Sequence, residues 1–237
     1  MLKLFVSVPI ACFRPGAARE FWETHPLPPP STVYGFLLAM VGEVDRQRHV
    51  GVRCTAGLLN EPDRSTVLRK LWRVKELQKK EDKTDDFSGS GVGANVRPDF
   101  QHLLTNIRLV VFVESSEEAA EGPTLEERLQ VALDPQQRNK IDRFGGLSLG
   151  ESTHMVDEVS LFERRIQHVD DEEPQVFLCE RHGNMTLPVW VDHVGRKGTR
   201  YVTGRLVSFA EALPVRDQVP QIDDGTLTES MIQDAKA

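Results

Sequence analysis

Hydrophobic and polar positions alternate at the start of the chain. Leu2, Leu4, Val6 and Val8 alternate with residues 3, 5 and 7, and this period-two pattern is typical of a β-strand. Residues 11–30 then show neither a helical nor a strand period, and they end in three consecutive prolines. The sequence therefore predicts a first strand followed by a long loop.

The clearest helical pattern follows these prolines. Prolines 28–30 favour an extended backbone, and Ser31 is the expected N-cap. Apolar residues then recur at i, i+3, i+4, i+7, i+8 and i+11 over residues 33–44. We expect a helix here, with Gly35 and Ala39 on a side that can lie close to another backbone.

The middle of the chain predicts a protruding hairpin. Residues 50–59 and 66–77 are strand-like, and residues 107–113 have the apolar run of a buried strand. Between them, residues 79–98 lose the pattern and are rich in glycine and serine. Two strand-like flanks around such a tip predict a long β-hairpin, here called the thumb, over about residues 64–106.

The second half is mostly strand-like. Thr124 and Glu127 have the spacing of a capping box that opens a short helix. Four strand-like segments follow, at residues 155–162, 175–180, 187–194 and 201–209. The pattern favours an α+β fold: a ferredoxin-like or RRM-like domain over residues 1–150 with the thumb inserted, then a small β-rich region over 151–237 with a loose acidic tail.

Composition places the chain among folded soluble proteins. It has 237 residues, of which 39% are hydrophobic and 27% charged. It has no apolar run of 18 residues, and its first residues do not resemble a secretory signal. The three cysteines are widely spaced and fit neither a disulfide framework nor a zinc ribbon. We expect a cytoplasmic protein.

Charge is unevenly distributed. The net charge is −7, yet residues 64–83 contain eight basic and three acidic residues. Because salt screens charges beyond about 8–10 Å, a basic arm on an acidic body can still bind a polyanion. A solvated amphipathic surface is the other interpretation, and charge alone does not separate the two.

A glycine-rich segment is the best candidate for phosphate binding. Gly145, Gly146 and Gly150 can direct backbone N–H groups toward an anion, and Arg143 adds a charged donor. The segment is neither a P-loop nor a Rossmann turn. A tight turn between strands explains it equally well.

Metal and catalytic signals are sparse. Cys179 with His182, and Glu151 with His154, each provide half of a metal site, so no metal and no cofactor are expected. The chain has no nucleophile elbow. His25 and His154 are the residues best placed for acid–base chemistry, although a lone loop histidine often has only a hydrogen-bonding role.

Two motifs together resemble the Cas-five (Cas5) family. A strand leads into Ala11–Pro15, which contains the Phe-Arg pair, and Pro28–Glu43 is similar to the pattern PP-S-x-x-G-x-L-x-A-x-x-G, with one more residue between Ser31 and Gly35. Residues 144–152 resemble the FGGLSLGES segment of the Myxococcus-type and cyanobacterial I-B-like branch. The resemblance covers about residues 1–210. Cas5 is a RAMP-superfamily subunit of the type I CRISPR effector complex called Cascade.

The resemblance implies a non-catalytic subunit that binds the 5′ handle of the crRNA. It implies that the chain caps the filament of Cas-seven subunits, adjoins the large Cas-eight subunit, and reaches target DNA through the complex. The complex would serve defence or RNA-guided transposition, which the sequence does not distinguish. No membrane partner is implied. The motif positions imply ten RNA-binding residues: Arg14, Arg19, Ser31, Arg143, Gly145, Gly146 and Ser148 around the handle, and Arg69, Lys70 and Arg73 in the thumb.

Two alternatives remain. One is a metal-independent ribonuclease that processes precursor crRNA with His25 or His154. The nuclease branch of the family uses a Tyr with an adjacent Lys-His pair, and this chain contains no Lys-His dipeptide. The other is an adaptor whose acidic surface binds a basic protein.

Overall fold

The structure, a computed structural model, describes residues 1–16, 21–72, 96–118, 121–143, 145–162, 173–194, 197–208 and 214–226. For residues 70–72 and 96–98 it describes the backbone alone. No helix among these residues is long and apolar enough to cross a membrane.

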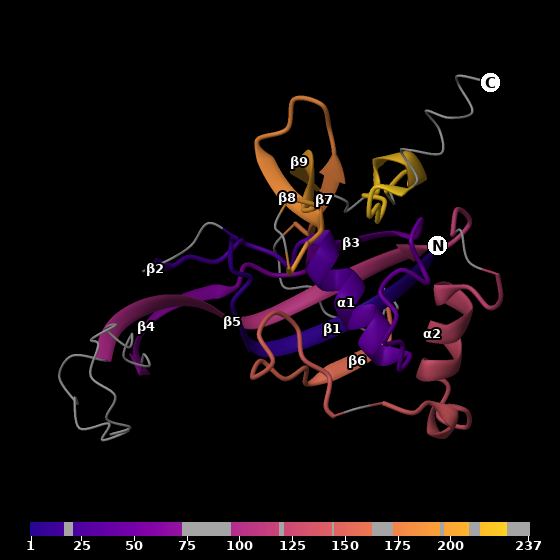
Figure 1. The fold of residues 1–237 in the computed structure, drawn as a ribbon, viewed down its shortest axis with the longest axis horizontal. Helices are drawn as coiled ribbons and strands as arrows, with labels where there is room; N and C mark the ends of the chain where they lie inside the picture. Colours follow the sequence, from indigo (N-terminus) through magenta and orange to yellow (C-terminus); the bar gives the residue numbers. More distant parts are fainter. Residues whose placement is uncertain are drawn as a thin grey trace, which may run out of the picture.

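Most of the described chain lies in one large sheet with two α-helices on it (Figure 1). The strands run in the order β6-β1-β5-β3-β7-β9-β8, and β2 and β4 pair with β5 beside this path. All neighbours are antiparallel except β2 and β5. The elements are β1 (Leu2–Ala11), β2 (Phe21–Trp22), α1 (Pro30–Met40), β3 (Arg53–Leu58), β4 (Asp63–Trp72), β5 (Val96–Glu114), α2 (Leu125–Leu133), η1 (Arg138–Lys140), β6 (Glu158–Leu161), β7 (Gln175–Cys179), β8 (Met185–Trp190), β9 (Arg200–Ser208) and η2 (Arg216–Gln218).

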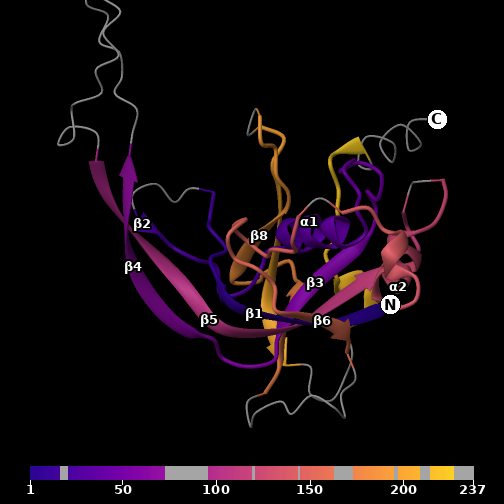
Figure 2. The same cartoon turned by 90° about the horizontal axis from the view of Figure 1, so that it is seen from below.

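The long strand β5 joins the thumb to the body. Its first half pairs with β4 and its second half with β1 and β3 (Figure 2). The change of partner falls at Asn106, which has a positive φ of 54°, a conformation that asparagine tolerates. Asn60 donates to the Asn106 carbonyl at 2.8 Å and accepts from the Arg108 N–H at 2.9 Å. The change from β3 to β4 as the partner of β5 therefore occurs at a defined point in the sheet.

The main core lies between the sheet and the helices. It contains the inward side chains of β1 and β5, such as Leu4, Val6 and Leu109, and the buried side of α1, such as Leu37. A smaller cluster around Phe112 lies on the other face of the sheet. At about 25 cal/mol per Å² of apolar surface, this burial is the main force that holds α1 against the sheet.

The predicted elements are largely confirmed, with two corrections at α1. The capping box of Thr124 and Glu127 is present. Ser31, however, is not the N-cap: Pro29 is, without a side-chain cap, and Ser31 lies inside the first turn. The helix also ends at Met40, so Val44 is 93% exposed instead of on its buried face. Proline at the first helical position sets φ and lacks the N–H that a serine cap would satisfy.

The thumb strands are also confirmed, since β4 and the first half of β5 are paired. The thumb tip, residues 73–95, lies outside the described residues. Strands after residue 150 join the same sheet, β6 at β1 and β7 at β3. The division into regions 1–150 and 151–237 stays a prediction, because the sheet is continuous across it.

Candidate nucleic-acid interface

Two arginines lie against one indole at the base of the thumb. Trp22 belongs to β2, and the Cζ atoms of Arg14 and Arg69 lie 4.1 Å and 4.5 Å from the centroid of its ring. Strand register brings them together: Trp22 pairs with Gln101, and Arg69 pairs with Asp99, two positions along on the same face of β5. The indole thus holds both cations on the side of the thumb that faces the body.

Arg69 is also tied to the glycine-rich segment. Its Nη1 donates to Gln101 Oε1 at 2.7 Å and lies 3.3 Å from Glu151 Oε2. Gln101 Nε2 donates to Glu151 Oε1 at 2.7 Å, so both the oxygen and the nitrogen of this buried amide are hydrogen-bonded. A guanidinium has five N–H donors, and one held in this way can still donate to a phosphate. We call the contacts of Arg14, Trp22, Arg69, Gln101 and Glu151 the thumb root.

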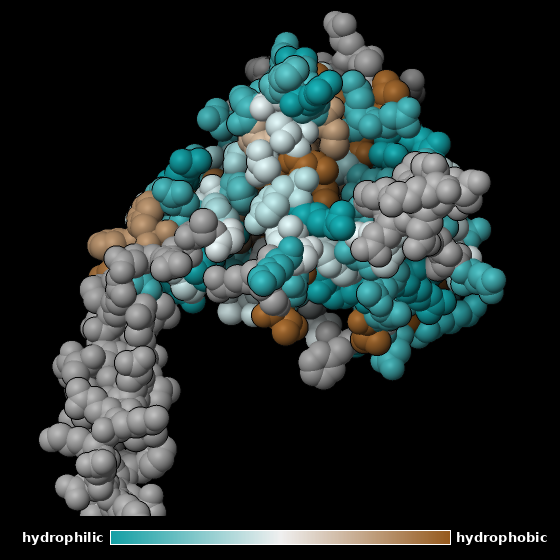
Figure 3. All heavy atoms as spheres, turned by 45° about the horizontal axis from the view of Figure 1, so that its top comes forward, coloured by the Kyte–Doolittle hydropathy of each residue, from teal (hydrophilic) through white to brown (hydrophobic). Residues whose placement is uncertain are grey.

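The opposite side of the thumb is apolar. Phe21 pairs with Phe100, and Phe100 pairs with Leu68, so the three side chains form a row across β2, β5 and β4. They are 40%, 50% and 58% exposed, and Figure 3 shows hydrophobic atoms gathered where the thumb leaves the body. The thumb therefore has a polar side toward the glycine-rich segment and an apolar side away from it.

The glycine loop, residues 145–151, is held against the end of β1. Gly150 has φ +93°, and a Cβ there would lie 2.7 Å from the Cys12 carbonyl oxygen. The Cys12 N–H donates to His154 Nδ1 at 3.2 Å. Because Nδ1 accepts, the neutral ring carries its proton on Nε2. Burial lowers the pKa of His154, which favours this neutral form of the ring. The loop is thus positioned by contacts that leave Glu151 directed at Arg69.

A groove of about 450 Å³ lies between α1, the glycine loop and β8. Ser31 and Ser148, both predicted to bind RNA, line it together with Trp190. Its α1 side includes the exposed residues Gly35 and Ala39. The α1 stripe of small residues therefore borders an open groove and does not pack against a neighbouring backbone.

Arg46 brings a cation to this groove. It comes from the segment after α1, and its Cζ lies 4.4 Å from the centroid of the Trp190 ring. Its Nη2 donates to the Val191 carbonyl at 3.0 Å, and the Tyr34 hydroxyl donates to the Arg46 carbonyl at 2.8 Å. Burial raises the pKa of Tyr34, so this hydroxyl keeps its proton. Arg46 is therefore held at both its backbone and its guanidinium.

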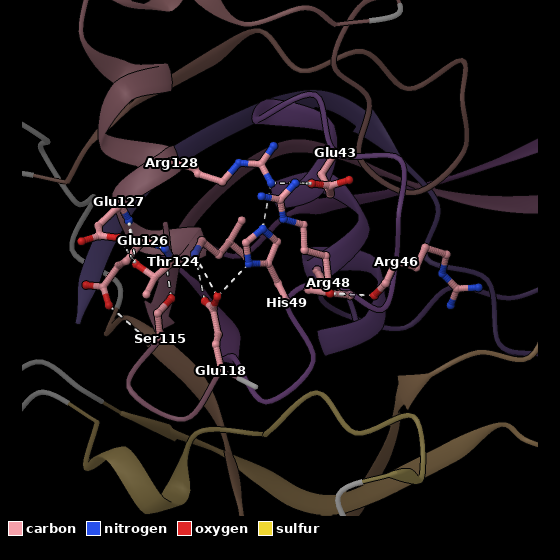
Figure 4. Close-up of polar contacts among 12 residues, drawn as sticks. Glu43, Arg46, Arg48, His49, Ser115, Glu118, Thr124, Glu126, Glu127 and Arg128 are labelled. Carbon is pink, nitrogen blue, oxygen red and sulfur yellow. Dashed lines mark hydrogen bonds and ion pairs between the residues drawn. The ribbon is translucent and has the colours of Figure 1, made fainter. Parts of the chain in front are cut away.

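Behind Arg46 lies a buried polar network, which we call the His49 network (Figure 4). His49 Nδ1 lies 2.7 Å from Glu118 Oε2, and its Nε2 lies 2.9 Å from Arg128 Nη1. A guanidinium only donates, so Nε2 accepts and Nδ1–H donates to Glu118. Arg128 and Arg48 both donate to Glu43, while Arg46 points away from the network.

The ten residues predicted to bind RNA have different positions. Four lie at the thumb root or the groove: Arg14, Arg69, Ser31 and Ser148. Three are exposed on or just before the glycine loop: Arg143, Gly145 and Gly146. Lys70 pairs with Pro98 in the thumb, but the structure describes only its backbone. Arg19 and Arg73 lie outside the described residues. Their contacts with RNA stay predictions.

Among the described residues, no group of three or more His, Cys, Asp and Glu side chains could hold a metal ion. His25 and His154 both lie beside the end of β1, since the His25 N–H donates to the Phe13 carbonyl and His154 accepts from Cys12. Burial lowers the pKa of both rings. The two histidines are neighbours of the thumb root and not parts of a separate site.

Five residues of this interface were not predicted from the sequence: Trp22, Arg46, Gln101, Glu151 and Trp190. Glu151 lies in the glycine-rich motif and Trp22 in the loop after the Phe-Arg pair, so their positions in the sequence could have indicated that they belong to the site. Arg46 and Trp190 are 144 residues apart and carry no shared pattern. Only the packing of β8 against α1 reveals their contact.

Comparison with known proteins gives the family. No protein-family model matches the chain. A curated relative, "CRISPR-associated protein Cas5" of Myxococcus xanthus (strain DK1622), is 45% identical over 225 residues, which are 94% of this chain and 97% of the relative. A chain of the solved "CRISPR RNA-guided surveillance complex" has the same fold, with a TM-score of 0.57 at 15% identity over 100% of this chain and 99% of that one. The identity to the Myxococcus protein over nearly its whole length shows that the chain belongs to the Cas5 family.

Proposed function

We propose that the chain is the non-catalytic, crRNA 5′-handle-binding subunit of a type I CRISPR effector. In this proposal it caps the filament of Cas-seven subunits, adjoins Cas-eight and contributes to RNA-guided binding of target DNA. Membership of the Cas5 family supports the proposal, and so does the fold shared with a chain of a CRISPR RNA-guided surveillance complex.

The sheet order supports a ferredoxin-like, RAMP-type domain. β1, β3, β5 and β6 lie in the order β6-β1-β5-β3, with α1 between β1 and β3 in sequence and α2 between β5 and β6. This succession is the β-α-β-β-α-β arrangement, with β4 and the first half of β5 added as the thumb. Folds of this kind present a sheet and loops to single-stranded RNA.

One observation carries the proposal: the thumb strand and the glycine loop meet at the thumb root. Arg14, from the Phe-Arg motif, and Arg69, from the thumb, lie on the same indole, and Arg69 contacts Glu151 of the loop. Sequence analysis predicted RNA contacts on each of these three elements separately. Their convergence supports a single continuous surface for one RNA strand.

The test is binding of a fluorescently labelled crRNA with its 5′ handle, in EDTA, at several salt concentrations. We expect saturable binding that weakens with salt at a log–log slope of about −0.7 per phosphate contact, with the RNA recovered intact. A handle with a scrambled sequence is the control. Absence of binding by the chain and by its assembled complex would overturn the proposal.

The ribonuclease alternative has a distinct outcome. A discrete cleavage product that His25→Ala or His154→Ala abolishes would establish it. The geometry favours the non-catalytic proposal, because His154 Nδ1 already accepts from Cys12 and its Nε2 carries the proton. A histidine in that state would have to change tautomer before it could act as a base.

A further inference from the structure

We propose that the groove between α1, the glycine loop and β8 holds one unstacked nucleobase of the bound RNA, which stacks on the guanidinium of Arg46. The inference rests on the proposed function and deepens it. It assigns a base-binding site to a groove where sequence analysis placed phosphate contacts, and it involves Arg46 and Trp190, which no motif indicated.

The charge of the groove suits a base better than a phosphate. Among the described residues that line it, Glu43 and Arg46 carry full charges, and His193 adds a titratable imidazole. The Glu43 carboxylate accepts from Arg128 and Arg48, and from the N–H groups of Val44 and Asp45. The groove therefore lacks the converging cations that hold a phosphate. A neutral heterocycle would enter it without the desolvation cost of a charge.

The walls of the groove suit a flat ring. Arg46 lies over the Trp190 indole, is held there by its bond to the Val191 carbonyl, and remains exposed where it lines the groove. Guanidinium planes stack on nucleobases, and the indole beneath keeps this one in place. On the other side, α1 presents Gly35, above which a Cβ would meet nothing within 4 Å, and the exposed Ala39. A volume of about 450 Å³ accommodates one base.

The rim of the groove provides polar groups for the edge of a base. The hydroxyls of Ser31 and Ser148 can each donate and accept a hydrogen bond, which suits any base edge. The backbone of the same nucleotide would then lie outside the groove. The exposed Gly145 and Gly146, and the exposed Arg143 before them, are the neighbouring groups for its phosphate. The base and the phosphate thus use different parts of the interface.

The decisive variant is Gly35→Leu. Its side chain would project into the open space of the groove, while leucine has a higher helix propensity than glycine, so α1 should be as stable as before or more so. The matched control is Gln130→Leu, which places the same side chain at an exposed position of α2. Thermal unfolding of both variants checks the fold.

The readout is a series of handle RNAs, each with one abasic position. Wild-type protein should bind one member of the series about tenfold more weakly than intact RNA, since stacking of a single base typically contributes at this level. Gly35→Leu and Arg46→Ala should bind intact RNA about tenfold more weakly and lose this sensitivity to the abasic position. Gln130→Leu should behave as wild type.

Three outcomes decide the matter. If wild type binds the handle but no abasic position matters, or if Gly35→Leu retains full affinity, the base site is overturned and the proposed function stands. If wild type binds the handle neither alone nor in its assembled complex, both the base site and the proposed function are overturned. If the sensitive position is the same in Gly35→Leu as in wild type, that base lies elsewhere on the protein, and the groove assignment is wrong.

Discussion

The thumb root and the His49 network are made of the same kinds of side chain but differ in their exposure to water. At the thumb root, the Arg69 and Glu151 side chains are 35% and 25% exposed. In the His49 network, the Arg128 and Glu43 side chains are 19% and 7% exposed, and those of His49 and Glu118 are 0% and 3% exposed. Both regions join an arginine to a glutamate, and both connect segments that are distant in the sequence.

The difference separates an arginine that can bind a ligand from one that supports the fold. An ion pair in water contributes about 0–1 kcal/mol, so Arg69 can exchange Glu151 for a phosphate at little cost. A buried pair that loses one partner leaves an uncompensated charge and destabilises a protein by about 3–5 kcal/mol. Arg128 is therefore a structural residue, although sequence alone presents it as one more basic position.

The largest effect is expected from Glu118→Ala. The change removes the acceptor of the His49 Nδ1–H and also the acceptor of the Leu125 N–H at the start of α2. We expect the free energy of unfolding to fall by about 2–4 kcal/mol, measured by urea denaturation followed by circular dichroism, because a buried N–H loses its acceptor and α2 loses a cap. Because about 0.5–2 kcal/mol is usual for a lost helix cap alone, a larger fall indicates that the buried hydrogen bond of His49 also contributes.

The matched control is Glu117→Ala, one residue earlier. Glu117 is 38% exposed and pairs with Arg53 and Arg216 at the surface. The Glu117→Ala change should lower the free energy of unfolding by less than about 1 kcal/mol. Equal losses of stability for the two variants would mean that burial does not distinguish Glu118 from Glu117.

A smaller loss of folding stability is expected at low pH. Burial alone would raise the pKa of Glu43, but hydrogen bonds from Arg128 and from the Asp45 N–H, and the charges of Arg128 and Arg48, lower it from 4.5 to about 2. With a folded pKa below the unfolded one, the stabilisation is complete above about pH 4.5 and is lost as the pH falls toward 2.

The variant Glu43→Gln tests this titration, because glutamine does not titrate. Urea midpoints of wild type and variant, measured from pH 6 to pH 2.5, should converge as the pH falls. The effect should be smaller than that of Glu118→Ala, since a protonated Glu43 keeps its volume and its ability to accept a hydrogen bond. A constant difference across this range would show that the charge of Glu43 is not what stabilises the network.

Local patterns predicted the elements that local interactions determine. The capping box of Thr124 and Glu127 depends on residues three apart, and both of its hydrogen bonds are present. The start of α1 was predicted wrongly at Ser31, because the sequence signal of a serine cap competes with that of a proline at the first helical position. The helix end was predicted too late, since Gly42, with φ +67°, interrupts an apolar period that continues in the sequence.

The candidate site depended on contacts that no local pattern contains. Arg14 and Arg69 were predicted as parts of two separate regions, and Trp22, which unites them, was not assigned a role. Arg69 and Glu151 are 82 residues apart, and only the pairing of β4 with β5 brings the arginine to the glycine loop. Motif position thus predicted which segments belong to the candidate site, whereas their meeting and the partners of each side chain required the tertiary structure.

The smallest change in stability, and the sharpest test of the comparison, is expected from Glu151→Gln. Glutamine has one acceptor oxygen, so it can keep the hydrogen bond from Gln101 and lose the one from Arg69, while removing a negative charge beside two arginines. Stability should change by less than about 1 kcal/mol, and RNA affinity should rise by about two- to fivefold, because a charge that repels phosphate is gone. Arg69→Ala should instead weaken binding by about tenfold, since it loses a charge-assisted phosphate contact. Both affinities are measured by fluorescence anisotropy with the handle RNA. If Glu151→Gln weakened binding as much as Arg69→Ala, the thumb root would be a fixed scaffold like the His49 network, and its exposure would not make Arg69 available to RNA.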